Sequence, residues 1–233
     1  MKAARPPFEN RMTPLQTALG WLWFPLYAVV IPLLLNIYAA FNAPNVTVVQ
    51  INLAYAGAGM AFVLIVMFSF LRRSFDAFAD KPLYCAGTIG LGLLADYALS
   101  AAVGVIFLAL RDTQENPNNA FILDMAGTDF GPVAAMTVFL SPIVEETLFR
   151  GVVFGSVAPR SRVWAYILSA ALFSLDHVWQ YAAAYADPLQ LVYALQYVPV
   201  SLVLAWCYDR TGSIWTPIFF HMGFNALSFL ILG

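Results

Sequence analysis

The sequence predicts an all-α, polytopic transmembrane helical bundle of about seven spans. Three observations predict it: 61 % of the 233 residues are hydrophobic, only 10 % are charged, and the mean hydropathy is +0.76. Soluble domains carry about 25 % charged residues, and long apolar runs with few charges are candidates for transmembrane helices. The net charge of -2 and the lack of a basic stripe favour no nucleic-acid partner.

The apolar runs, separated by polar or charged connections, define the expected spans. They cover about 15–41, 52–71, 83–110, 131–157, 163–181, 189–208 and 214–232. The first run exceeds the 7–15 apolar residues of a signal peptide, so an uncleaved first span is expected. Residues 72–82 are expected to form a charged connector, and 111–129 a long polar connection compatible with a short interfacial helix around 121–125.

The distribution of basic residues predicts the orientation. If the N-terminus lies in the cytoplasm, the outer segments contain only Arg111, while the cytoplasmic segments hold Lys2, Arg5, Arg11, Arg72, Arg73, Lys81, Arg160, Arg162 and Arg210. Cytoplasmic loops of membrane proteins are enriched in Lys and Arg. We therefore expect an N-in, C-out protein.

Residues 141–151 place two adjacent carboxylates and an arginine inside an apolar span. Glu146 and Arg150 are four residues apart, which is the spacing of an ion pair on one helix face. Glu145 is rotated by roughly 100° from Glu146, so the two carboxylates occupy different environments. An ionisable residue at bilayer depth is costly and often functional. The alternative is that both glutamates only pair with Arg150 to hold helices together.

The two histidines of the chain lie in later spans, His177 in the fifth and His221 in the seventh, with Asn225 one turn after His221. Measured from the cytoplasmic turns, Glu145 lies roughly 15–18 Å deep and His221 roughly 12 Å, but His177 comes out at roughly 20–24 Å. The depth of His177 therefore disagrees with that of its expected partners. Pro142, which precedes the carboxylates, is expected to kink its helix and open space.

These residues resemble a known family. The motifs Glu-Glu-x-x-x-Arg-Gly, Phe-x-x-x-His and His-x-x-x-Asn, in that order on successive spans, resemble the intramembrane endopeptidases of the CPBP family, which includes CAAX prenyl proteases and bacteriocin-processing relatives. The resemblance covers 131–233. It divides one membrane domain into an N-terminal part with three spans and an outer loop, 1–130, and a four-span catalytic core, 131–233.

The resemblance implies a glutamate-dependent intramembrane protease. It makes Glu145 the general base that activates water, with Glu146 and Arg150 in support. It makes His177 a positioning group for that water, and His221 and Asn225 donors to the oxyanion. Donors fixed at an oxyanion supply much of the rate in acyl transfer. No cofactor is expected under this mechanism, but Glu145, His177 and His221 also form a two-histidine, one-carboxylate set of the kind that binds catalytic zinc.

The expected surroundings are the lipid bilayer and a membrane-embedded peptide or protein substrate. We expect an integral protein of a bacterial inner membrane, with its site opening toward the cytoplasm. Two other functions remain open from the sequence. The chain could be a non-catalytic or accessory subunit of a larger membrane complex that shares the CPBP fold, or a transporter or channel, which also places acids and histidines at membrane depth.

Overall fold

The computed structural model describes residues 8–109 and 116–232, and these residues form helices and short connections without a strand. Within these described residues, five continuous helical stretches are long and apolar enough to cross a membrane: Pro14–Asn42, Val48–Ala79, Pro82–Ala109, Phe130–Val157 and Pro188–Thr211. The all-α membrane class is therefore confirmed. The count of seven spans and the N-in orientation stay predictions.

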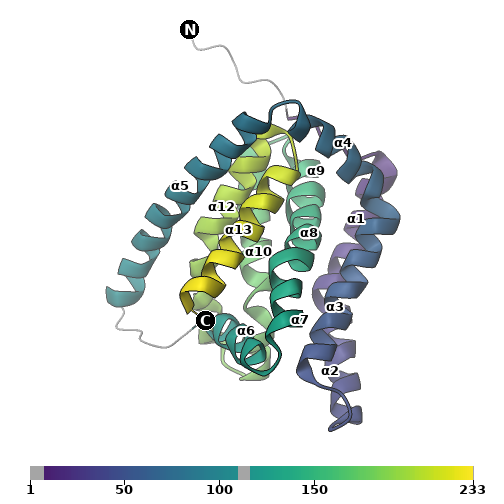
Figure 1. Ribbon diagram of the computed structural model, residues 1–233, viewed down its shortest axis with the longest axis vertical. Coiled ribbons are helices and arrows are strands. Elements are labelled where there is room, and N and C mark those ends of the chain that lie inside the picture. The colour runs from purple at the N-terminus through teal and green to yellow at the C-terminus, as the bar shows by residue number, and fades with distance from the viewer. Residues whose placement is uncertain (1–7, 110–115, 233) are drawn as a thin grey trace.

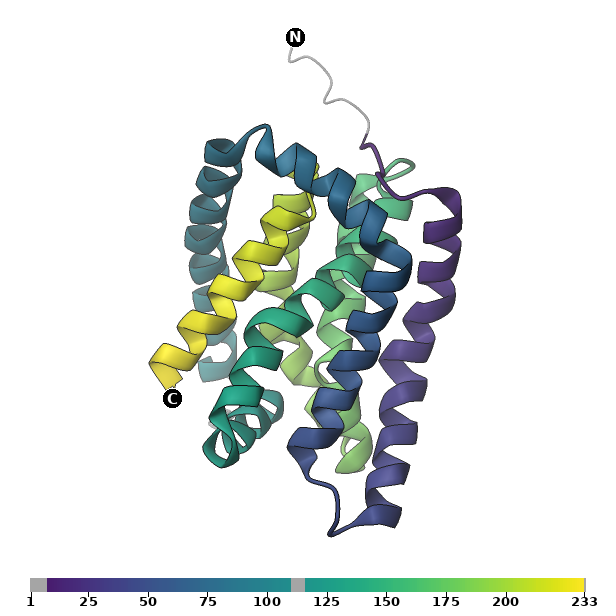
Figure 2. The same ribbon diagram turned by 45° about the vertical axis from the view of Figure 1, so that its right-hand side comes forward.

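The first two crossing stretches are composite helices that pack side by side (Figure 2). The first contains α1 (Pro14–Pro25), η1 (Leu26–Val30) and α2 (Ile31–Asn42); the second contains α3 (Val48–Phe62), η2 (Val63–Met67) and α4 (Phe68–Ala79). Thr13 and Thr47 begin α1 and α3 with capping boxes, in which each threonine accepts from the backbone of a glutamine three residues later. The elements η1 and η2 are π-helical.

The expectation of a charged connector at 72–82 is wrong for most of its length, because α4 continues to Ala79. The charged face of α4 has partners at the bundle surface. Arg73 donates to the carbonyl oxygen of Arg11 at 3.0 Å and to Oε1 of Gln16 at 2.8 Å. Because these contacts satisfy the hydrogen-bond donors of the Arg73 guanidinium, the backbone can remain helical here. The chain turns only at Asp80 and Lys81, before α5 (Pro82–Ala109).

The remaining elements build the centre of the bundle and one of its ends. They are α6 (Pro117–Thr128), α7 (Phe130–Ala135), η3 (Met136–Leu140), α8 (Ser141–Glu145), η4 (Glu146–Phe154), α9 (Gly155–Val157), α10 (Arg162–Asp176), α11 (Trp179–Ala184), η5 (Pro188–Tyr193), α12 (Ala194–Thr211) and α13 (Trp215–Leu232). In Figure 1, α8, α10, α12 and α13 lie between α5 on one side and α1 and α3 on the other.

One expected span and one expected interfacial helix differ from the prediction. The α10 helix has 15 residues and ends at Asp176, so it is shorter than the roughly 20 residues that cross a bilayer. The chain then turns into the separate six-residue α11. The interfacial helix compatible with 121–125 is longer than expected, since α6 has 12 residues. Asn116 caps its start, and the side chain of Asn116 accepts from the backbone of Asn118 and Asn119.

One buried core runs through both parts of the chain. It joins residues of α1, η2 and α4, such as Phe24, Met67 and Phe70, to Val152 of η4 and Ile218 of α13. A boundary near residue 130 stays a prediction, and this shared core agrees with a single membrane domain.

Arginines gather at one end of the bundle, where they join distant segments. Nε of Arg11 donates to the carbonyl of Gly212 at 3.1 Å, Arg73 donates to the carbonyl of Arg11, and Nε of Arg162 pairs with Asp209 at 3.1 Å. We call this the basic end. The opposite end, here called the far end, contains α6, α11 and η5 (Figure 1).

Candidate active site

The helix that carries the two carboxylates alternates between α- and π-helical geometry. The π-helical η3 ends where the backbone N–H of Ser141 donates to the carbonyl of Met136, five residues earlier. Pro142 then occupies the first turn of α8, where its missing N–H costs little. A second π-helical stretch, η4, begins at Glu146. Such wide turns are frequent at functional sites. The kink expected at Pro142 stays a prediction.

Glu146 and Arg150 form the predicted ion pair in the core. Nη1 of Arg150 lies 3.0 Å from Oε1 of Glu146, and both side chains are fully buried. Nη2 of Arg150 donates to Oγ of Ser201 at 2.9 Å and to its carbonyl at 3.1 Å. The guanidinium also stacks on Phe173, at 4.3 Å from the ring centroid. These contacts join the motif helix to α12 and α10.

Glu146 also binds one of the two histidines, which the sequence did not predict. Nδ1 of His221 lies 2.8 Å from Oε1 of Glu146. A carboxylate paired with an arginine accepts hydrogen bonds, so the proton lies on Nδ1 of His221. Glu146 therefore links Arg150 to His221 and sets the orientation of that imidazole, in addition to the structural role expected from its spacing.

Glu145 differs from its neighbour in exposure and in contacts. Its side chain is 19 % exposed, whereas that of Glu146 is buried. Oε2 of Glu145 lies 3.8 Å from Nε2 of His177 and 3.9 Å from Nε2 of His221, and among the described residues it has no hydrogen-bond partner. The structure thus brings the carboxylate and both histidines to one point, with Glu145 accessible from a cavity.

The protonation of the histidines follows from their other nitrogens. Nδ1 of His177 lies 2.8 Å from the carbonyl of Phe173, which can only accept, so this nitrogen carries the proton. In their neutral forms His177 and His221 both direct the lone pair of Nε2 toward Oε2 of Glu145. Two imidazole nitrogens and one carboxylate oxygen, all hydrogen-bond acceptors, therefore converge. Such a set requires a group that all three can bind, either a shared proton, a water molecule or a cation.

The disagreement over the depth of His177 is resolved by side-chain direction. Side chains on a helix lean toward its N-terminus. The bond from His177 to Phe173, four residues earlier, folds the imidazole back along α10 toward the basic end. Glu145 lies on a helix of opposite direction, so its side chain leans away from the basic end. The two side chains therefore meet although their backbones were expected at different depths.

Asn225 lies on the wall of the same cavity, one turn beyond His221. Its Nδ2 donates to the carbonyl of Thr137 at 2.8 Å, which joins α13 to η3. One of its two amide hydrogens is used in this contact. The second is available for the oxyanion role that the resemblance implies, and that role stays a prediction.

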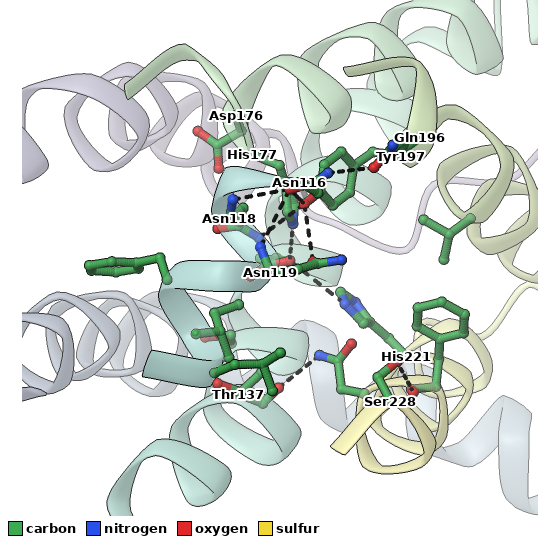
Figure 3. A pocket seen from close by; sticks show the side chains of 18 of the residues that line it. Asn116, Asn118, Asn119, Thr137, Asp176, His177, Gln196, Tyr197, His221 and Ser228 are labelled. Carbon is green, nitrogen blue, oxygen red and sulfur yellow. Dashed lines mark hydrogen bonds and ion pairs between the residues drawn. The ribbon is translucent and has the colours of Figure 1, made fainter. Parts of the chain in front are cut away.

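A cavity of about 350 Å³ begins at Glu145, His177 and His221. Its lining residues come from α3, α5, α6, η3, α8, α10, α11, α12 and α13. Several amide side chains line it toward the far end, and we call one group of them the amide rim: Asn116, Asn118, Asn119, Gln180 and Gln196. Figure 3 shows four of them grouped beside Tyr197 and His177.

Tyr197 connects the amide rim to the candidate catalytic residues. Its hydroxyl donates to Oδ1 of Asn116 at 3.0 Å and accepts from Nδ2 of Asn118 at 3.1 Å, while its ring lies 4.5 Å from the imidazole of His177. Sequence reasoning missed Tyr197 and the rim. The cluster Asn116 to Asn119 was visible only as a turn signal, because nothing local relates it to residues about 80 positions away.

The zinc alternative can be compared with these distances. Tetrahedral zinc with ligand bonds near 2.0–2.1 Å holds its ligand atoms about 3.3 Å apart. The observed 3.8 and 3.9 Å would have to shorten by about half an ångström. In the described part of the chain no three His, Cys, Asp or Glu side chains are grouped closely enough to hold a metal ion as they stand. The donor types do fit zinc, since two bare Nε2 atoms and one carboxylate oxygen converge.

Comparisons with known proteins agree with the motifs. Residues 128–227 match the family described as type II CAAX prenyl endopeptidase Rce1-like. This match falls on the residues that carry the resemblance to the CPBP family, and it covers less than half of the chain. A relative in Bacillus subtilis (strain 168), named "putative membrane peptidase YdiL", is 29 % identical over 114 residues, which are 48 % of this chain and 42 % of that protein. The match thus spans less than half the length of the curated relative. No solved structure matches the chain.

Proposed function

We propose that this protein is an intramembrane endopeptidase of the CPBP type in which Glu145 activates the attacking water. One observation carries the proposal: the side chain of Glu145 is partly exposed at the inner end of a cavity, and its Oε2 lies within 3.9 Å of Nε2 of two histidines. A buried arginine and carboxylate beside them, Arg150 and Glu146, hold one of those histidines in place. The family match and the peptidase relative support the same reaction class.

The proposed reaction is hydrolysis of a peptide bond. Water between Glu145 and His177 donates one proton to Oε2 of Glu145 as its oxygen attacks the carbonyl carbon, and Nε2 of His177 accepts from the other hydrogen. Glu145 then gives its proton to the leaving nitrogen, so that one water is consumed and a carboxylic acid and an amine are released. No serine or cysteine nucleophile takes part.

The oxyanion of the tetrahedral intermediate needs hydrogen-bond donors. His221 can donate from Nε2 when both of its nitrogens are protonated, and Glu146 stabilises that imidazolium through its bond to Nδ1. The free amide hydrogen of Asn225 is the second proposed donor. Donors placed in this way are worth roughly 10²–10³ in kcat each.

The experiment compares membranes that contain the wild type with membranes that contain Glu145→Gln, and searches for protein termini produced only by the wild type. Because the side chain of Glu145 makes no hydrogen bond to other described residues, the isosteric variant should fold normally, and cleavage should fall by roughly 10²–10⁴-fold. Asp124→Asn, an exposed carboxylate on α6, is the matched control and should cleave normally. Full cleavage by Glu145→Gln would exclude the proposed base.

A zinc-dependent peptidase is the alternative mechanism, with Glu145, His177 and His221 as ligands. Zinc would supply Lewis-acid activation of the same water. Purified protein should be assayed for cleavage after dialysis against strong chelators and analysed for bound metal. Undiminished cleavage by metal-free protein supports the glutamate mechanism. Loss of cleavage that added zinc restores would support the zinc mechanism.

A further inference from the structure

The cavity extends from the catalytic residues in one direction only. On every helix that lines it, the lining residues lie between the level of Glu145 and the far end. On α3 and α12, which begin at the far end, they are near the start, such as Asn52 and Gln196. On α5 and α13, which run toward that end, they lie in the later turns, such as Ser100 and Phe229.

The path toward the basic end is closed by packed side chains. Arg150, Phe154 and Tyr208 are completely buried. Phe8 packs edge-on against both aromatic rings, at centroid distances of 5.4 Å to Phe154 and 5.1 Å to Tyr208. A substrate could not reach Glu145 from the basic end without unpacking this core.

The two ends also differ in charge. The helix ends and turns at the basic end carry seven basic residues: Arg11, Arg72, Arg73, Lys81, Arg160, Arg162 and Arg210. The described residues of α6, α11 and η5 include no Lys or Arg, and Asp124, Asp129 and Asp187 lie in or beside these elements. Basic residues favour the cytoplasmic side. The cavity extends away from the basic end, so an N-in chain with its basic end in the cytoplasm cannot also have a cytoplasmic opening. Of these two expectations, the charge pattern favours the N-in chain.

We propose that the cavity opens on the non-cytoplasmic side of the membrane and receives an extended segment of a peptide or protein substrate from that side. The substrate part of this inference rests on the proposed function. The amide rim suits such a ligand, because an extended backbone presents unpaired N–H and C=O groups and amide side chains both donate and accept. Asn119 is exposed and Gln180 is half-buried, so both can be reached from the mouth.

Cysteine labelling in membranes of known orientation tests the opening independently of catalysis. The native Cys85 and Cys207 are buried, so the wild type gives the background. Asn119→Cys reports on the mouth, and Asp80→Cys, on the exposed turn before α5, is the matched control at the basic end. A membrane-impermeant maleimide should label Asn119→Cys in spheroplasts and Asp80→Cys only in inverted vesicles. The reverse pattern, or no labelling of Asn119→Cys from either side, overturns the proposal.

A second variant tests whether the cavity is continuous from the mouth toward Glu145. Ser141 lies one helical turn before Glu145 and lines the cavity, so Ser141→Cys is a small change. A small cationic methanethiosulfonate reagent should modify it from the outside of spheroplasts. Modification only from the cytoplasmic face would overturn the direction of access. Repeating the labelling in the Glu145→Gln variant separates the two proposals, because the label pattern should persist when cleavage is lost.

The cleavage sites themselves test the substrate class. Termini that depend on Glu145 should map to non-cytoplasmic or membrane-embedded segments of their proteins. Termini confined to cytoplasmic segments would overturn the substrate part, whatever the labelling shows.

Discussion

Replacing Arg150 with methionine removes the guanidinium and keeps most of the apolar stem. The change breaks the 3.0 Å ion pair with Glu146, two hydrogen bonds to Ser201 and the stacking on Phe173. Removing one partner of a buried pair costs about 3–5 kcal/mol, because the other charge remains buried. The stacking adds about 0.5–2 kcal/mol. We therefore expect a loss of about 5 kcal/mol in the free energy of unfolding.

The double variant Arg150→Met with Glu146→Gln identifies the source of that loss. The glutamine is neutral, and its carbonyl oxygen can still accept from Nδ1 of His221. We expect the second substitution to recover about 2 kcal/mol, since no buried charge is left unpaired.

Reversible unfolding in mixed detergent micelles measures these differences. Arg160→Met is the matched control, because Arg160 is exposed and its guanidinium makes only one long contact, 3.5 Å to the carbonyl of Ser156. The control should stay within about 0.5 kcal/mol of the wild type. If the single and double variants are equally destabilised, the unpaired charge of Glu146 is not the cause and the reasoning is wrong.

Two further predictions concern stability. A Cβ on Gly59 would lie 2.7 Å from both Tyr27 and Val144, so Gly59→Ala should destabilise the protein by about 1–3 kcal/mol. Gly57→Ala is the control, because a Cβ there meets open space and should not destabilise it. Equal melting temperatures of the two variants would contradict this. Asp96 on α5 is 1 % exposed, and its Oδ1 has no hydrogen-bond partner among the described residues. Asp96→Leu should therefore leave stability unchanged or raise it by about 1–3 kcal/mol. The same unfolding assay measures this change. A clear loss of stability would mean that Asp96 has a partner.

The local pattern of the sequence predicted much of the site. The spacing of Glu146 and Arg150 predicted their ion pair, and the rotation of Glu145 predicted that it would face a different environment. Both predictions depend only on helix geometry and on the cost of burying a charge. The motif order also predicted which three helices would contribute side chains.

Composition and hydropathy determined that this protein is an all-α membrane bundle, since they report how each segment behaves in lipid. Only the tertiary structure decided that Glu146 binds His221, that Tyr197 and the amide rim line the cavity, and that α4 is helical through its charged residues. It also decided the direction in which the cavity extends. These features depend on contacts between residues 60 to 80 positions apart, which no helical period encodes.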